Sequence, residues 1–261
     1  MFDLDKWQEI FETIRKNKLR TILTGFSVAW GIFMLIILLG SGYGLENGVR
    51  QEFAGDAVNY ISINGGVTSK AYKGMKPGRR IQFENEDHAI LAGLSNVDMS
   101  SDRSRLWQIS TINYKSQYGT FDVFAISPDY RYVEDLDMMD GRFLNQKDQD
   151  ETRKVAALGR LVYEELFKGT PAVDKYVNIG GVPFKVVGVF NDPGSDRDLQ
   201  RVYITTSAGQ RVFGMGEQIN SIQLMLGDAS VEESYQTVEE IKSSMSDKFK
   251  FDPQDTRALF I

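Results

Sequence analysis

The longest uncharged segment of the chain lies near its N-terminus. No charged residue occurs between Arg20 and Glu46, and the segment contains the unbroken apolar run 32–39. A helix needs about 20 predominantly apolar residues to cross a hydrocarbon core about 30 Å thick. The run is longer than expected for a signal peptide, and the glycine-rich residues 40–44 lack an Ala-x-Ala cleavage site. Residues 21–45 therefore predict an uncleaved transmembrane helix.

The residues before this segment predict a second, amphipathic helix. Apolar residues recur there at spacings of three and four, which place them on one face of a helix: Leu4, Trp7, Phe11 and Ile14. Residues 1–20 are therefore expected to lie on the cytoplasmic membrane surface, although packing against another part of the protein is an alternative. Four basic residues would form the elbow that joins this helix to the span: Arg15, Lys16, Lys18 and Arg20.

The distribution of basic residues predicts the orientation of the span. The basic elbow precedes it, whereas Arg50 is the only basic residue between Glu46 and Tyr60. Lys and Arg are enriched on the cytoplasmic side of membrane spans. We therefore expect a cytoplasmic N-terminus and a chain that is extracytoplasmic from about residue 48 onward.

A stripe of small residues continues through the end of the span. Gly40, Gly44 and Gly48 are spaced four residues apart, and such stripes allow close approach of helices in a membrane. Flexibility at the membrane exit is the alternative. Because the helical pattern continues through Leu45, Val49 and Phe53, we favour packing against another span, with residues 46–57 as a stalk.

The remaining residues alternate between strand-like and helix-like patterns and predict an α+β chain. The N-terminal amphipathic and transmembrane helices are followed by a mixed α/β extracytoplasmic domain over 58–252, in two subdomains, and residues 253–261 would lead into a missing second span. The clearest hairpin has strands at 176–179 and 182–190 around Gly180-Gly181. The other predicted strands are 58–64, 106–118, 119–126, 155–158, 201–205 and 221–226; the predicted helices are 85–94, 160–167, 207–213 and 231–248.

The amino-acid composition excludes several classes of partner and functional site. The 261 residues include 30 Lys and Arg, 36 Asp and Glu, one His and no Cys, which gives a net charge of −6. This charge argues against a nucleic-acid partner, and the missing Cys and single His exclude Cys-based and multi-His metal sites. The chain contains no P-loop and no G-x-S-x-G motif. We expect no catalytic, cofactor-binding or metal site in this chain, and His88 is expected to be an exposed surface residue.

Charged residues also gather in three predicted loops. The carboxylates at 134–140 and 192–198 lack the spacing of an EF-hand, so solvated loops are expected. A glycine- and lysine-rich loop over 64–80 could contact anionic lipid or a partner, although a solvated loop is the favoured interpretation. Its basic residues are Lys70, Lys73, Lys76, Arg79 and Arg80.

Several short segments resemble one known family. Residues 11–25, FETIRKNKLRTILTG, resemble the start of MacB/FtsX-like ABC transporter permeases. The extracytoplasmic part resembles the MacB-type periplasmic core domain, although Ala125 and Ser127 depart from its pattern. Its matching segments are VFAISPDY at 123–130, DGRFL at 140–144, ALG at 157–159, FKVVGV at 184–189 and VYIT at 202–205. Each segment is unspecific alone, but together they follow the family's order from about Trp7 to Gln254.

This resemblance implies a permease subunit of the bacterial inner membrane with four spans, of which this chain is a fragment. ATP would be hydrolysed by a separate cytoplasmic ABC ATPase subunit and coupled to motion of the periplasmic domain, for export or extraction of a substrate. Further implied partners are the lipid bilayer, a second permease copy or paralogue, and a periplasmic adaptor. The alternative is a single-span anchored protein with an extracytoplasmic binding or scaffold domain; an anchored enzyme is a third.

Overall fold

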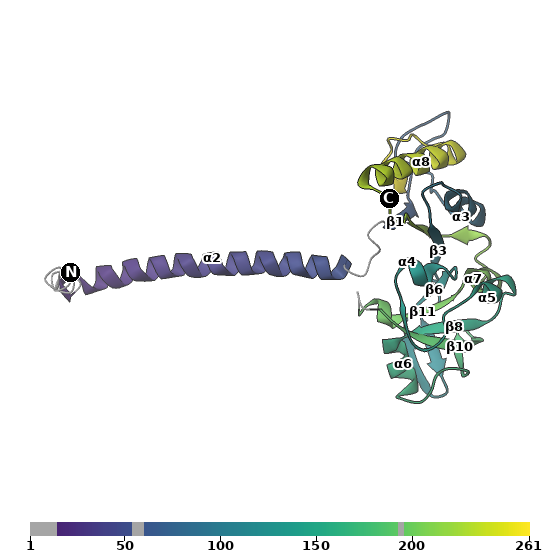
Figure 1. Ribbon diagram of the computed structural model, residues 1–261, viewed down its shortest axis with the longest axis horizontal. Coiled ribbons are helices and arrows are strands. Elements are labelled where there is room, and N and C mark those ends of the chain that lie inside the picture. Colours follow the sequence, from purple (N-terminus) through teal and green to yellow (C-terminus); the bar gives the residue numbers. More distant parts are fainter. Residues whose placement is uncertain (1–14, 54–59, 193–195) are drawn as a thin grey trace. The chain divides into compact units, whose positions relative to one another are not determined.

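The computed structural model describes residues 15–53, 60–192 and 196–261. The chain divides into two units, Met1–Phe53 and Ala54–Ile261. Most of the amphipathic helix expected over 1–20 therefore lies outside the described residues. Within the first unit, α2 (Lys18–Phe53) is one continuous helix of 36 residues (Figure 1). It contains the predicted span and continues into the predicted stalk.

Four hydroxyl groups of α2 form hydrogen bonds within the helix itself. The hydroxyls of Thr21, Thr24 and Ser27 each donate a hydrogen bond to the carbonyl four residues earlier. The hydroxyl of Ser41 donates to the carbonyl of Leu38. A helix in hydrocarbon must satisfy its polar groups internally, because no water is available to them. These four hydroxyls meet this requirement within the helix.

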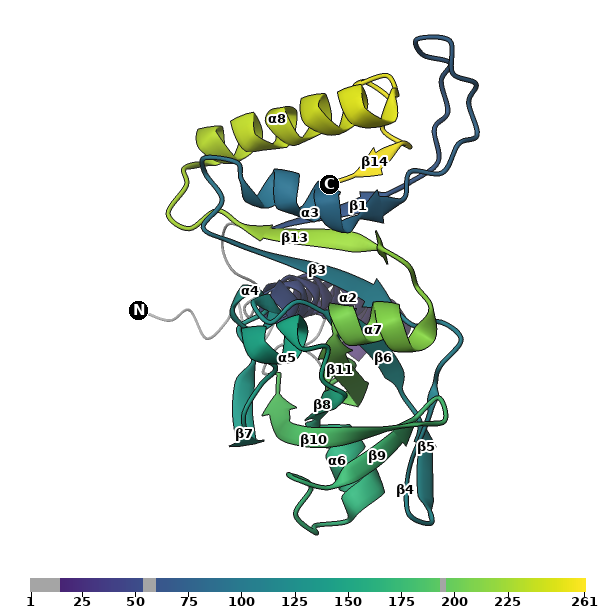
Figure 2. The ribbon, with the colours of Figure 1, turned by 90° about the vertical axis from the view of Figure 1, so that its right-hand side faces the viewer.

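The second unit is built on a mixed sheet of 12 strands. Eleven strands follow the order β14-β1-β13-β3-β6-β11-β8-β10-β9-β4-β5, and β7 pairs with β10 (Figure 2). The β6–β11 and β8–β10 pairs are parallel and the others are antiparallel. The strands are β1 (Tyr60–Gly65), β3 (Met99–Arg105), β4 (Thr111–Tyr114), β5 (Gln117–Thr120), β6 (Asp122–Ile126), β7 (Asp137–Gly141), β8 (Val155–Gly159), β9 (Tyr176–Ile179), β10 (Val182–Asn191), β11 (Arg201–Thr205), β13 (Ser221–Met225) and β14 (Leu259–Phe260).

Helices cover this sheet at both ends. Figure 2 shows α8 and α3 beside β1 and β13 at one end of the domain, and α6 beside β9 and β10 at the other. The helices are α3 (Asn85–Ala92), α4 (Tyr130–Val133), α5 (Gln146–Asp150), α6 (Arg160–Phe167), α7 (Thr206–Phe213) and α8 (Val231–Phe249), with a 3₁₀ turn at Asp198–Gln200. A short separate sheet pairs β2 (Phe83–Glu84) with β12 (Gln218–Ile219).

The buried apolar side chains form separate clusters at the two ends of the sheet. One cluster joins β1 and β13 to α8, with Ile63, Ile222 and Ile241 fully buried at its centre. At the other end, two further clusters lie around β6, β8, β10 and β11, one of which includes Phe190 and Tyr203. Because Ala54–Ile261 is one compact unit built on one continuous sheet, the division into two subdomains stays a prediction.

The predicted hairpin is confirmed. Strands β9 and β10 pair from Val182 opposite Ile179 onward, and the turn between them is Gly180-Gly181. Both glycines have positive φ, at 56° and 87°, which side-chain-bearing residues rarely adopt. A Cβ on Gly180 would also lie 3.1 Å from side-chain atoms of Ile109 and Phe213. The turn therefore needs glycine for its backbone angle and for close packing.

The prediction of one strand over 106–118 is wrong. The range instead contains β4 and the start of β5, and β3 lies before it; the polar sequence MSSDRSR of β3 gave no strand pattern. Its polar side chains are buried but hydrogen-bonded: the hydroxyls of Ser101 and Ser127 are 2.8 Å apart, and the Asn220 amide donates to Ser104 Oγ over 2.9 Å. Burial of polar groups is tolerated when they are paired in this way.

The C-terminal residues are part of the folded domain. Strand β14 pairs with β1, with Leu259 opposite Gly65 and Phe260 opposite Asn64. Ala258 and Leu259 are buried. The domain therefore extends beyond residue 252, and a second span after it stays a prediction.

Candidate functional site: an apolar helix and a buried ionic network

The surface of α2 is apolar and uncovered. The most apolar 18-residue window within Lys18–Gly44 has a mean hydropathy of 2.4, and none of the side chains of Lys18–Gly44 is buried among the described residues. Ile36 and Leu38, for example, are 63% and 69% exposed. Apolar surface of this extent requires an apolar environment. The stretch is long and apolar enough to cross a membrane.

The small-residue stripe lies on this helix. A Cβ added to Gly40 or Gly44 would meet no described atom within 4 Å, so this face is open. Gly48 also lies within α2, one turn further along. The structure places the three glycines on one helix at the predicted spacing. Their role in packing against another helix stays a prediction.

The four predicted elbow residues lie at the N-terminal end of α2. Lys18 and Arg20 are in its first turn, and Arg15 and Lys16 directly precede it; all four are exposed. The carbonyl of Asn17 accepts hydrogen bonds from both the amide and the hydroxyl of Thr21. The structure brings four cationic side chains to one end of the apolar helix. Their contact with lipid headgroups stays a prediction.

A buried ionic network begins at the first strand of the domain. The hydroxyl of Tyr60 donates to Glu134 Oε1 over 3.2 Å, and this carboxylate lies 4.0 Å from Nη1 of Arg103. Arg103 in turn donates to the hydroxyl of Tyr130 over 3.1 Å. The Glu134 side chain is only 13% exposed, so the interpretation of this carboxylate as part of a solvated loop is wrong. Tyr60 opens β1, the first strand of the second unit.

Aromatic rings extend this network across the sheet. The guanidinium carbons of Arg103 and Arg201 lie 5.8 and 5.2 Å from the centre of the Phe124 ring, within cation–π range. Arg201 also pairs with Asp198. Burial raises the pKa of Asp198 to about 6, and the Arg201 charge opposes this rise. Burial likewise raises the pKa of Tyr203 to about 12. The network therefore holds two guanidinium groups against an apolar core.

A second polar cluster links elements from both ends of the sheet. Asp102 is buried on β3, and its carboxylate accepts a hydrogen bond from the Thr206 hydroxyl on α7. His88 on α3 lies 3.9 Å from Asp102 through Nδ1 and 3.0 Å from the hydroxyl of Ser100 through Nε2. The His88 side chain is 22% exposed, so the expectation of an exposed surface histidine is wrong. Burial raises the pKa of the Asp102 carboxyl group, and the neighbouring His88 opposes this shift.

The basic loop over 64–80 is hydrogen-bonded to the rest of the domain rather than only solvated. Lys70 Nζ donates to the carbonyl of Gln254, and Arg79 Nη1 to the carbonyl of Phe249, both over 3.0 Å. Asp255 accepts hydrogen bonds from the amide and the hydroxyl of Ser69. The sequence gave no signal of these contacts, because their partners lie more than 160 positions away. Three carboxylate or histidine ligands suited to a metal ion do not gather anywhere in residues 15–53, 60–192 and 196–261.

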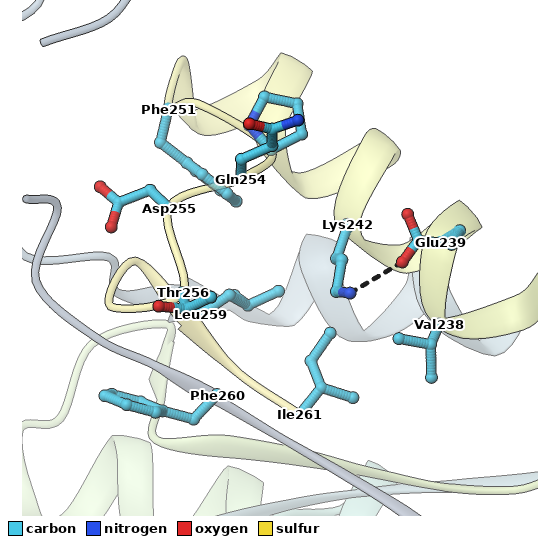
Figure 3. A pocket seen from close by; sticks show the side chains of 11 residues that line it. Val238, Glu239, Lys242, Phe251, Gln254, Asp255, Thr256, Leu259, Phe260 and Ile261 are labelled. Atoms are coloured by element: carbon cyan, nitrogen blue, oxygen red, sulfur yellow. Dashed lines mark hydrogen bonds and ion pairs between the residues drawn. The ribbon is translucent and has the colours of Figure 1, made fainter. Parts of the chain in front are cut away.

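A groove lies between α8 and the C-terminal residues (Figure 3). Its volume is about 510 Å³, and its apolar lining includes Val238, Phe251 and Ile261. Lys242 and Glu239 form an ion pair of 2.8 Å at its rim. The groove follows the edge strand β14 and was not predicted from the sequence.

The fold and the apolar helix together define a class of protein, namely one with a candidate membrane span followed by a mixed α/β domain. The family model for the MacB-like periplasmic core domain matches residues 21–241. The chain belongs to this family, which confirms the resemblance found in the sequence. It is thus a membrane protein of the ABC permease type with an extracellular domain.

Curated relatives are described as transport proteins. The macrolide export ATP-binding/permease protein MacB of Chlorobaculum tepidum is 26% identical over 214 residues, which are 79% of this chain and 32% of the relative. The uncharacterized ABC transporter permease YvrN of Bacillus subtilis is 27% identical over 199 residues, which are 72% of this chain and 47% of the relative. The chain thus spans about a third to about a half of the length of these relatives.

Solved structures show the same fold. The periplasmic region of MacB from Actinobacillus actinomycetemcomitans superposes with a TM-score of 0.64 at 19% identity, covering 80% of this chain and 90% of that one. The extracellular domain of the transporter YknZ from Gram-positive bacteria also gives 0.64, at 20% identity, covering 77% of this chain and 97% of that one. At these identities the likeness concerns the fold.

Proposed function

We propose that this chain is the first span and the extracytoplasmic domain of an ABC permease subunit that couples ATP hydrolysis to movement of the domain. The observation that carries the proposal is an uncovered apolar helix in a chain whose residues 21–241, most of that helix included, match the MacB-like periplasmic core domain. ATP would be bound and hydrolysed by a separate cytoplasmic ATPase subunit. This chain would bind no cofactor and would catalyse no reaction itself.

The continuous helix α2 supports a mechanical role. At 1.5 Å per residue its 36 residues extend about 54 Å, which exceeds a hydrocarbon core of about 30 Å. Part of the helix would therefore project beyond the membrane as a stiff extension. Movement of the spans would reach the domain through this extension and through β1, where Tyr60 enters the buried ionic network.

The N-terminus would be cytoplasmic, and the domain would lie outside the bacterial inner membrane. The basic residues before the span and their scarcity after it support this orientation. Arg15, Lys16, Lys18 and Arg20 would bind lipid headgroups at the cytoplasmic surface.

The glycine stripe would contact another span of the assembled permease. Gly40, Gly44 and Gly48 would let a neighbouring helix approach closely, from this subunit or from a second copy or paralogue. A periplasmic adaptor is a further expected partner. The moving domain would export or extract a substrate.

Labelling of single cysteines tests the orientation, because the 261 residues contain no Cys. Glu232 lies on an exposed part of α8. A membrane-impermeant maleimide is therefore expected to label Glu232→Cys in intact spheroplasts, without permeabilisation. Lys16→Cys should be labelled only after permeabilisation. Labelling of Lys16→Cys in intact spheroplasts would contradict the proposed orientation.

Purification tests the partnership. The protein, expressed with its complete reading frame and extracted from membranes, should carry with it an ABC ATPase, and the pair should hydrolyse ATP. A reading frame without further spans, together with no co-purifying ATPase, would instead support a single-span anchored binding or scaffold protein.

A further inference from the structure

A pocket of about 350 Å³ lies between the end of β3 and the segment that joins α7 to β13. None of its lining residues belongs to the ionic network around Glu134. Its volume falls within the range of ligand sites, about 300–1,000 Å³. Residues from two chain segments line it, 105–109 and 213–220, including Trp107, Gln108, Phe213, Met215, Gln218 and Asn220.

An exposed tryptophan forms one wall of the pocket. The Trp107 side chain is 73% exposed, which is unusual for a residue of its size. The guanidinium carbon of Arg105 lies 4.0 Å from the centre of its ring. This stacking orients the indole and covers one of its faces, so the exposed surface lies on the other face and the edges.

Part of the pocket lining is apolar and packs against the rest of the domain. The ring of Phe213 stacks on Phe184, with centroids 5.9 Å apart and planes 14° from parallel. Ile109 and Phe213 also pack against the Gly180 turn of the β9–β10 hairpin. The pocket is therefore a built feature of the fold.

The rim provides uncharged hydrogen-bonding groups. Two hydrogen bonds hold Asn220 in place. Its side-chain oxygen accepts from the backbone amide of Arg105 over 3.0 Å, and its backbone amide donates to Ser104 Oγ. Its side-chain NH₂ group has no partner among the described residues, and neither do the amide groups of Gln108 and Gln218. Each free amide can donate or accept hydrogen bonds.

These features select a chemical class of ligand. Arg105 is the only charged residue that lines the pocket among those described, and it is already paired with Asp122, so an anionic ligand gains little. A purely apolar ligand would strip water from the amides without replacing its hydrogen bonds, which is unfavourable. A sugar has closely spaced hydroxyls for the amides and a polarised C–H face that suits the negative face of an aromatic ring.

We propose that this pocket binds a neutral carbohydrate, with Trp107 as the stacking platform and Gln108, Gln218 and Asn220 as hydroxyl partners. Binding requires neither ATP nor a second subunit, so it is independent of the proposed transport role. The result of the binding experiments therefore neither supports nor contradicts the proposed orientation and ATPase partnership, which are tested separately.

Fluorescence titration tests the proposal on the full chain in nanodiscs. The chain has three tryptophans, so Trp7→Phe with Trp30→Phe leaves Trp107 as the single reporter. Maltotriose and N,N′,N″-triacetylchitotriose are the probes. Saturable quenching or enhancement by at least one of them is expected. No change with either probe up to millimolar concentration would overturn the proposal.

Calorimetric titration of substituted chains tests the residues. Trp107→Ala should weaken saccharide binding at least about tenfold, as expected for a central aromatic contact. Gln218→Ala should weaken it by a smaller factor. The matched control is Tyr118→Ala, because Tyr118 is 75% exposed but lies outside the pocket lining. Unchanged binding by Trp107→Ala, or equal loss in Tyr118→Ala, would contradict the assignment. A thermal unfolding curve for each variant excludes loss of fold as the cause.

Discussion

Apolar and hydroxyl side chains have opposite environments in the helix α2 and in the sheet of the second unit. In residues 18–44 of α2 the apolar side chains are uncovered, and hydroxyls such as that of Thr24 bond to the helix's own carbonyls. In the sheet the apolar side chains are buried, and hydroxyls such as that of Ser101 bond across to other elements. The domain thus completes its own packing, whereas α2 depends on lipid or on another helix. This difference leads to opposite expectations for substitutions in the two units.

The largest effect is expected in the core of the domain. Phe190 is fully buried and stacks on Tyr203 with ring centroids 4.8 Å apart. Phe190→Ala should lower the free energy of unfolding by about 3–5 kcal/mol, because it removes buried surface and leaves a cavity. Urea denaturation measures the change. Tyr118→Ala, at an exposed aromatic residue, is the control and should change stability by less than about 0.5 kcal/mol.

A charge in the middle of α2 distinguishes lipid from water around the helix. Leu35 is 57% exposed, so Leu35→Arg would be nearly neutral if the helix lay in water. In a bilayer the same change should oppose insertion by about 2.5–3.5 kcal/mol. Carbonate extraction of membranes should then release more of the variant, whereas Leu35→Phe should stay in the membrane. Equal retention of Leu35→Arg and the parent chain would contradict a spanning α2.

A smaller, pH-dependent effect is expected at Asp255. Burial would raise the pKa of this carboxyl group, but hydrogen bonds from Ser69, Lys70 and Arg257 lower it to about 2. A lowered pKa in the folded state stabilises the fold above the unfolded value of about 3.9, and this contribution is lost as the pH falls toward 2.

Asp255→Asn should therefore lower the free energy of unfolding at pH 7 by about 1–2 kcal/mol. The difference from the parent chain should shrink between about pH 4 and pH 2. Denaturation at a series of pH values measures it. Asp252→Asn provides a neighbouring carboxylate as control. A deficit that is independent of pH would show that the charge of Asp255 is not the cause.

The smallest effect on the fold is expected at the glycine stripe. A side chain at Gly44 meets open space, so Gly44→Leu should leave unfolding of the domain unchanged. In the complete permease it should reduce assembly, because the added side chain separates packed helices. Cross-linking and size-exclusion chromatography measure assembly, and Leu38→Ala is a control on the same helix. Unchanged assembly and transport in Gly44→Leu would refute the packing role.

The features that could be predicted from the sequence have strong local signals. The length of the uncharged segment predicted α2, Gly180-Gly181 predicted the hairpin, and the spacing of Val231, Tyr235, Val238 and Ile241 predicted α8. Short motifs in family order indicated the family. None of these inferences required a contact between distant residues.

The features that were missed depend on such contacts. Strand β3 is polar and becomes a central strand because its neighbours in the sheet satisfy its side chains. Glu134 has the sequence surroundings of a solvated loop, but the fold places it beside Tyr60 and Arg103. The pocket at Trp107 joins segments about 100 positions apart. Local patterns contain no information about these pairings.

The pairing of β1 with β14 has a mechanical consequence. The first and last strands of the domain are antiparallel neighbours, so the chain enters through β1 and leaves through β14 at the same end of their ladder. Because β14 is an edge strand that pairs only with β1, a load on either strand reaches the rest of the sheet through the five residue pairs that join β1 to β13. Forces along both connections at once would pull β1 and β14 in the same direction, so the two residue pairs between them would carry little shear. The ladder between β1 and β13 is therefore the mechanical link between these two strands and the remainder of the sheet.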